Sequence, residues 1–150
     1  MALDLDIIRG RIQFIEDSLK LLESLATCPF DEFETDFRNV ESAKHLLQVA
    51  IESMLDICTH IVARLRLGIP NDDRETLALL EDKGLFPSTH IATYQAMNAF
   101  RNRVVHLYQD VDTREIYRIL REDLDDFRMF IADVQHVVAG QKQDADKEAT

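Results

Sequence analysis

The sequence predicts an all-helical protein, folded as an up-and-down bundle. Apolar residues recur at three- and four-residue steps in several long segments, which is the period of an amphipathic helix. No segment alternates apolar and polar residues for long enough to indicate a strand, and the chain has only four glycines and three prolines. We therefore predict four long helices and one short helix, packed around one core.

The first two long helices are predicted over about residues 4–26 and 37–67. Asp4 is available as the N-cap of the first helix. The acidic run at 31–36 between them is interpreted as a solvated linker. The second helix is apolar over a wide arc, as is usual for a central helix of a bundle, and Gly68 is expected to end it.

A short helix is predicted over about 73–83, capped by Asn71 or Asp72 and ended by Gly84. The last two long helices are predicted over about 89–109, with Ser88 as N-cap, and 113–139, with Gly140 at the end. We expect residues 1–139 to form one domain and the polar residues 140–150 to form a flexible tail. The second and last helices are too apolar to be covered by one small bundle, which favours a homodimer.

Composition limits the class of function. The formal net charge is −11, and a strongly acidic protein binds nucleic acid poorly unless it has a local basic patch or an assembly to provide one. Cys28 and Cys58 fit neither a zinc ligand pair nor a disulfide framework, which indicates a reducing cytoplasm. The first residues lack a signal-peptide pattern, and no stretch approaches the roughly 18 apolar residues of a membrane span. We expect a soluble, cytoplasmic protein.

Residues 97–112 carry the candidate site. On a helix, the apolar residues of this stretch share a core-facing stripe, namely Met97, Phe100, Val104, Leu107 and Val111. The polar side opposite holds Asn98, Asn102, His106 and Gln109. Arg101 and Tyr108 lie on one line at the border between the two sides. A helix face that only needed solubility would more often carry Glu and Lys.

These side chains suit phosphodiester chemistry. Histidine is the residue best matched to proton transfer near neutral pH, and arginine binds a phosphate through paired charge-assisted hydrogen bonds. We predict that Arg101 holds the scissile phosphate of RNA and that His106 moves a proton. Asn102 would hold the imidazole in one tautomer or donate to the phosphate. No metal ligands stand nearby, so we predict no metal and no other cofactor.

Each residue also has an ordinary structural interpretation. Arg101 would then pair with an acid of the last helix, His106 would be a partly buried structural histidine, and Tyr108 an aromatic at the bundle edge. The geometry adds a constraint, because Arg101 and His106 point about 140° apart on an ideal helix. Two copies of the helix, packed antiparallel about a two-fold axis, would bring both side chains to one cleft.

Other polar residues give weaker signals. Glu52, Asp56, Thr59 and His60 form a line on the second helix, which is either a solvent-facing strip or a polar seam. Asp56 and His60 have the spacing of a metal-ligand pair, but no third ligand is evident. The remaining histidines, His45, His90 and His136, lack ligand spacing.

The segment RNRVVHLY at 101–108 resembles the R-x4-H-x-Y motif of the HepT toxins, which are HEPN-type ribonucleases encoded beside a minimal nucleotidyltransferase (MNT) antitoxin. HLLQVAIESMLDICTHIVARLRLGIP at 45–70, LEDKGLFP at 80–87 and the extension of the motif to residue 117 resemble the same family. The likeness therefore covers most of residues 1–139.

The resemblance implies an all-helical homodimer in which Arg101 and His106 cut RNA, such as tRNA or mRNA, without a metal. It also implies that the partner nucleotidyltransferase transfers AMP to Tyr108 and so silences the toxin, in a complex that includes the homodimer or a larger assembly. An alternative interpretation is a non-catalytic HEPN-like module that binds nucleotide or protein and acts through a nucleotidyltransferase partner. The acidic charge favours that alternative, whereas the intact Arg, His and Tyr set favours the nuclease.

Overall fold

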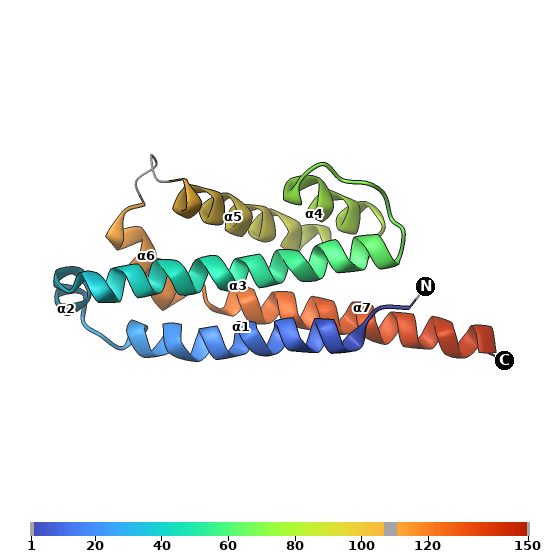
Figure 1. Ribbon diagram of the computed structural model, residues 1–150, viewed down its shortest axis with the longest axis horizontal. Coiled ribbons are helices and arrows are strands. Elements are labelled where there is room, and N and C mark those ends of the chain that lie inside the picture. Colours follow the sequence, from blue (N-terminus) through green and yellow to red (C-terminus); the bar gives the residue numbers. More distant parts are fainter. Residues whose placement is uncertain (1, 107–110, 150) are drawn as a thin grey trace.

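The computed structural model describes residues 2–106 and 111–149, and all regular secondary structure within these ranges is helical. The long helices are α1 (Leu5–Ala26), α3 (Phe37–Arg64), α5 (Ser88–Val105) and α7 (Asp125–Ala149). The short helices are α2 (Phe30–Thr35), α4 (Asp73–Asp82) and α6 (Thr113–Glu122). Successive long helices run in alternate directions along the molecule, which confirms the predicted up-and-down bundle (Figure 1).

Helix α3 is the centre of the bundle, as predicted, because it contacts α1, α2, α4, α5 and α6. Its apolar residues are buried at nearly every turn; those with no exposed surface are Ala43, Leu47, Ala50, Met54, Ile57, Cys58 and Ile61. By length and composition α3 could span a membrane, although no stretch was expected to come near that limit. Burial of 56% of its most apolar window inside the protein accounts for this composition, because a core helix is apolar for the same reason.

The acidic linker is in part a helix, so the prediction for residues 31–36 was wrong. Helix α2 begins after Pro29, with Asp31 and Glu32 in its first turn, where negative charge is favourable to the helix dipole. Phe33 is fully buried and its ring lies 5.2 Å from that of Tyr117 on α6. One buried aromatic residue thus fixes a helix that is too short to be stable alone.

The predicted last helix is two helices. Helix α6 ends at Glu122, and α7 begins at Asp125 on the far side of a turn in which Leu124 is buried. Apolar residues keep their three- and four-residue steps through this turn, so periodicity alone does not reveal it. The acidic run Asp123, Asp125 and Asp126 is the missed signal, because acids suit the start of α7 and not the interior of a continuous helix.

Gly140 does not end the last helix, as had been predicted. Helix α7 continues through it to Ala149, and a Cβ at Gly140 would meet nothing within 4 Å. A lone glycine costs a helix only about 1 kcal/mol relative to alanine, and good helix formers flank this one. The independent mobility of residues 140–150, and their separation from a domain of 1–139, stay predictions.

The predicted caps of the first helices are largely confirmed. Asp4 accepts from the backbone N–H groups of Asp6 and Ile7 at the start of α1, and Asp72 accepts from the N–H of Glu75 at the start of α4. Helix α3 ends at Arg64, before Gly68, and the following Arg66 has a positive φ of 53°. The chain therefore leaves the helix earlier than the glycine had indicated.

Candidate active site

Helix α5 is shorter than predicted. It begins at Ser88, so Pro87 and not Ser88 occupies the N-cap position, and no side chain caps it. It ends at Val105, and His106 is the C-cap residue with an extended backbone (φ −84°, ψ 107°). Two β-branched residues, Val104 and Val105, precede this end and weaken helix propensity there. The predicted extension of the helix to residue 109 was wrong at His106, and residues 107–109 lie outside the described residues.

The core stripe of α5 is confirmed where it is described. Phe100 is buried, and Met97 and Val104 are partly buried against the core. The predicted polar side is only partly correct, because Asn102 and His106 are exposed but Asn98 is 7% exposed. Asn98 is tolerated in this position because its side-chain oxygen accepts a hydrogen bond from Arg101, one turn further along the helix.

Arg101 is held by the neighbouring helix α4. Its Nη2 lies 2.7 Å from Asp73 Oδ2 and 3.4 Å from Asn98 Oδ1. The Arg101 side chain is 19% exposed, and its buried Nε has no hydrogen-bond partner. The ordinary interpretation of Arg101 expected an acid on the last helix, and the structure instead places the acid on α4. Arg101 is therefore a partly buried, oriented cation.

A cleft of about 1160 Å³ opens between α4 and α5 and contains Arg101. Asn102 lines the same cleft, so the structure brings these two predicted residues together. The α4 side is acidic, since Asp73, Glu75 and Glu81 all line it. Arg74 also lines the α4 side, so the cleft of the single chain holds two guanidinium groups, and carboxylates outnumber them.

His106 and Tyr108 lie at and beyond the end of α5. The backbone N–H of His106 donates to the carbonyl of Asn102 at 3.1 Å, and the His106 side chain is exposed outside the residues that line the cleft. Because His106 leaves the helical path, the ideal-helix angle of about 140° between it and Arg101 does not apply. Tyr108 lies outside the described residues, and so do Leu107 and Gln109 of the predicted faces.

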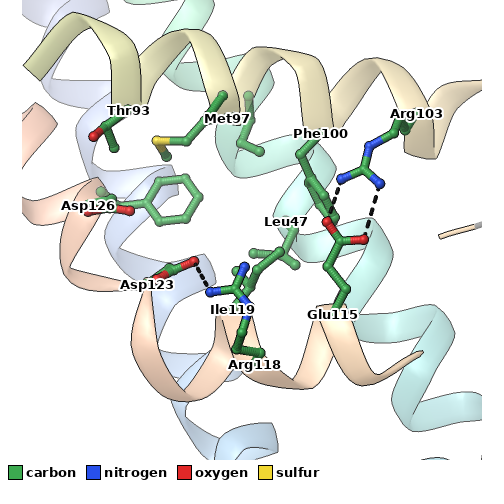
Figure 2. Close-up of a pocket in the computed structure, with 13 residues that line it drawn as sticks. Leu47, Thr93, Met97, Phe100, Arg103, Glu115, Arg118, Ile119, Asp123 and Asp126 are labelled. Carbon is green, nitrogen blue, oxygen red and sulfur yellow. Dashed lines mark hydrogen bonds and ion pairs between the residues drawn. The ribbon is translucent and has the colours of Figure 1, made fainter. Parts of the chain in front are cut away.

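A second cavity of about 320 Å³ lies on the other side of α5, between α3, α6 and the start of α7. Figure 2 shows Arg103 at its mouth, where two nitrogens bind both oxygens of Glu115 at 3.1 and 2.5 Å. Asp126 also lines this cavity, and partial burial raises its pKa, with the charges of Asp123 and Asp125 adding to the effect. Arg103 is thus paired through two nitrogens and lines a different cavity from Arg101.

His60, which the sequence places in a polar line with Asp56, has a structural partner. His60 Nε2 accepts from the backbone N–H of Asp4 at 3.0 Å, and its pKa is lowered by burial and by the charge of Arg64. Asp56 pairs with Arg11 at 3.5 Å. Within residues 2–106 and 111–149, no three His, Cys, Asp or Glu side chains are grouped as metal ligands would be.

His90 belongs to a polar cluster that joins α5 to α7. Its Nδ1 lies 2.8 Å from Asp133 Oδ2, and the hydroxyl of Tyr94 donates to the same oxygen. Tyr94 is fully buried, and burial together with the Asp133 hydrogen bond raises its pKa. The cluster fixes the helix that carries Arg101.

Sequence reasoning missed Asp73 and Asn98 as residues that contact Arg101. Asp73 stands 28 positions before Arg101, in a segment whose acids were considered only as caps. No local pattern links the two positions, because their contact depends on how α4 packs against α5. Asn98 was one turn from Arg101 and could have been considered as its acceptor.

The up-and-down helical bundle and its arginine–histidine motif define a domain of the HEPN class. The solved structure of the tri-AMPylated Shewanella oneidensis HEPN toxin in complex with MNT antitoxin is similar, with a TM-score of 0.81 and 28% identity over 87% of this chain and 97% of that one. The chain belongs to the HepT-like family, whose model, described as Ribonuclease HepT-like, matches residues 15–134. This confirms the resemblance inferred from the motif.

Two relatives are named for their RNA substrates. The chain is 29% identical to the mRNA nuclease HepT of Shewanella oneidensis over 84% of its own length and 94% of the relative's. It is 22% identical to the tRNA nuclease HepT of Aphanizomenon flos-aquae over 85% of its length and 87% of the relative's. The sequence similarity therefore extends across nearly the whole length of both relatives.

Proposed function

We propose that this protein is the toxin of a toxin–antitoxin pair and an endoribonuclease, whose Arg101 and His106 cleave RNA without a metal. The observation that carries the proposal is the oriented Arg101 guanidinium in the α4–α5 cleft, on the helix that ends at His106. The nuclease names of the two relatives and the family description support the reaction class. Free thiols at Cys28 and Cys58 support a cytoplasmic location.

Arg101 binds the scissile phosphate in this mechanism. A guanidinium offsets the negative charge that builds on the phosphoryl oxygens in the transition state, and it does so best when its orientation is fixed beforehand. Asn102 lies on the same cleft and donates to the phosphate or orients the imidazole. Cleavage of the phosphodiester changes no oxidation state. Arg101 and Asn102 therefore have to provide only binding and charge stabilisation.

His106 moves the proton. The ribose 2′-oxygen attacks the phosphorus as a neutral imidazole takes its proton, and the bond from phosphorus to the 5′-oxygen breaks. The leaving 5′-oxygen then takes a proton from a protonated imidazole or from water. A homodimer provides two copies of His106, one neutral and one protonated, at one cleft on the two-fold axis.

Tyr108 is the proposed site of inhibition. Its hydroxyl oxygen attacks the α-phosphorus of ATP on a nucleotidyltransferase of the MNT type, pyrophosphate leaves, and the tyrosyl proton passes to the transferase or to water. The HEPN toxin solved with MNT antitoxin is described as tri-AMPylated, which supports this kind of modification. Each AMP adds a negative phosphate close to Arg101 in sequence and would exclude RNA.

The test of the nuclease is expression of the chain alone. Wild type should arrest growth and cleave RNA in the presence of EDTA, whereas Arg101→Ala and His106→Ala should do neither. Arg103→Ala is the matched control, because Arg103 lies on the same helix and pairs with Glu115 away from the cleft. Growth arrest that survives both site substitutions would rule out the nuclease mechanism.

The test of the modification is a mass measurement. Wild-type protein incubated with the cognate nucleotidyltransferase and ATP should gain adenylyl mass, and Tyr108→Phe should gain none. An equal gain in Tyr108→Phe would identify another acceptor.

The non-catalytic alternative also has an observation in its favour. The net charge is −11, and Asp73 already occupies one nitrogen of Arg101 in the single chain. A binding module would associate with the nucleotidyltransferase yet leave RNA intact in the same assay. Cleavage that is lost on Arg101→Ala distinguishes the enzyme from this module.

A further inference from the structure

The contact between Asp73 and Arg101 differs from the other arginine pair on α5. Arg103 uses two nitrogens against both oxygens of Glu115, at 3.1 and 2.5 Å. Arg101 uses only Nη2, which lies 2.7 Å from Asp73 and 3.4 Å from Asn98. A guanidinium has five N–H donors. The Arg101 pair thus fixes one corner of the group and leaves Nη1 to a second acceptor, whereas Nε is buried.

The carboxylate that holds Arg101 is itself firmly placed. Asp73 is the first residue of α4, where the helix dipole favours a negative charge. The preceding Asp72 caps the same helix by accepting from the N–H of Glu75 at 2.9 Å. Asn98, which shares Nη2 with Asp73, is buried on α5. Residues of two helices, α4 and α5, therefore hold the Arg101 side chain.

A fixed orientation matters for an arginine that must bind a phosphate. The arginine side chain has many rotamers, and a misplaced cation stabilises a transition state far less well than an oriented one. Asp73 limits the rotamers of Arg101 without using all of its donors. The nearby carboxylate also repels the substrate phosphate, so Asp73 does not strengthen the binding of RNA in the ground state.

We propose that Asp73 is the positioning residue for Arg101: its carboxylate, fixed at the start of α4, holds Nη2 so that the rest of the guanidinium is presented to the scissile phosphate. This inference rests on the proposed ribonuclease function. It extends the site from α5 to α4 and assigns to the reaction a residue that touches no reacting atom.

The two effects of Asp73 on the kinetics have opposite signs. Loss of orientation lowers kcat, and loss of a negative charge near the phosphate leaves KM unchanged or lowers it. Asp73→Ala should therefore lower kcat by about tenfold or more without raising KM. Asp73→Asn keeps an acceptor oxygen and should recover most of that loss. A residue that merely stabilised the fold would show neither the split nor the rescue.

The assay is multiple-turnover cleavage of an RNA oligonucleotide by the purified full-length protein, with kcat and KM measured for each variant. Asp82→Ala is the matched control, because Asp82 is an exposed acid of α4 that lies outside the residues lining the cleft. It should keep kcat within about twofold of wild type. Thermal unfolding of each variant reports the change in stability separately.

Three results would overturn the inference. Asp73→Ala could keep wild-type kcat while Arg101→Ala is inactive, which leaves the proposed function intact and removes the role of Asp73. Asp82→Ala could lower kcat as much as Asp73→Ala, which would attribute the effect to the overall charge or stability of α4. If Arg101→Ala itself cleaves RNA at the wild-type rate, the proposed function fails and the positioning role fails with it.

Discussion

Removal of the Asp133 carboxylate should destabilise the fold more than any other single polar substitution in the contact between α5 and α7. Asp133 has a side chain that is 12% exposed, and it accepts from His90 and from the fully buried Tyr94 hydroxyl. Asp133→Ala leaves that hydroxyl without an acceptor, at a cost of about 1–3 kcal/mol. It also removes the His90 hydrogen bond, worth about 1 kcal/mol more. We expect a loss of about 3 kcal/mol in the free energy of unfolding.

Urea denaturation followed by circular dichroism measures this loss. Tyr94→Phe removes only the hydroxyl and should cost about 1.5–3 kcal/mol, less than Asp133→Ala, because His90 still pairs with the carboxylate. Glu34→Ala is the control: Glu34 is an exposed acid on α2, and its loss should stay within about 0.5 kcal/mol. An Asp133→Ala protein as stable as Glu34→Ala would refute the view that this cluster anchors α5.

Two further predictions concern stability. The pKa of His60 is lowered by burial and by Arg64, below its usual 6.5, so the unfolded chain binds that proton more readily. The contribution of neutral His60 to stability is complete above about pH 6.5 and is lost as the pH falls through the pKa of the folded state. The wild type should therefore lose more stability than His60→Gln between about pH 7.5 and pH 5. Equal losses in the two proteins would contradict this prediction. The Arg103–Glu115 pair is 40% and 30% exposed, so a double-mutant cycle with alanine should give a coupling of about 1 kcal/mol or less, and a much larger value would mean that the pair is shielded from solvent.

The general fold was predictable because helix periodicity depends only on local sequence. The four long helices, the central position of α3 and the Asp4 cap follow from patterns of that kind. Helix α2 and the turn between α6 and α7 were missed for a common reason. In both places the local pattern was ambiguous, and the burial of a residue of that segment, Phe33 or Leu124, against the rest of the chain decides the structure.

The candidate site was predictable in its residue types and not in its contacts. The motif placed Arg101 and Asn102 on one helix, and they line one cleft. The partner of Arg101 could not be found this way, because Asp73 approaches it only through the packing of α4 on α5. The end of α5 at Val105 was also missed, since the apolar stripe continues in sequence through Leu107.

The acidic charge of the protein implies that RNA affinity arises in the assembly. The chain has 28 acidic and 17 basic residues, and the described ion pairs already engage Arg11, Arg38, Arg101, Arg103, Arg118 and Arg128. The net charge of −11 opposes a phosphate backbone, so the affinity of a single chain for RNA should be weak at physiological salt concentration. Two copies that meet at the end of α5 would place two Arg101 groups at one position. Local cationic density at that axis, and not the overall charge, would then select a phosphate that lies beside His106.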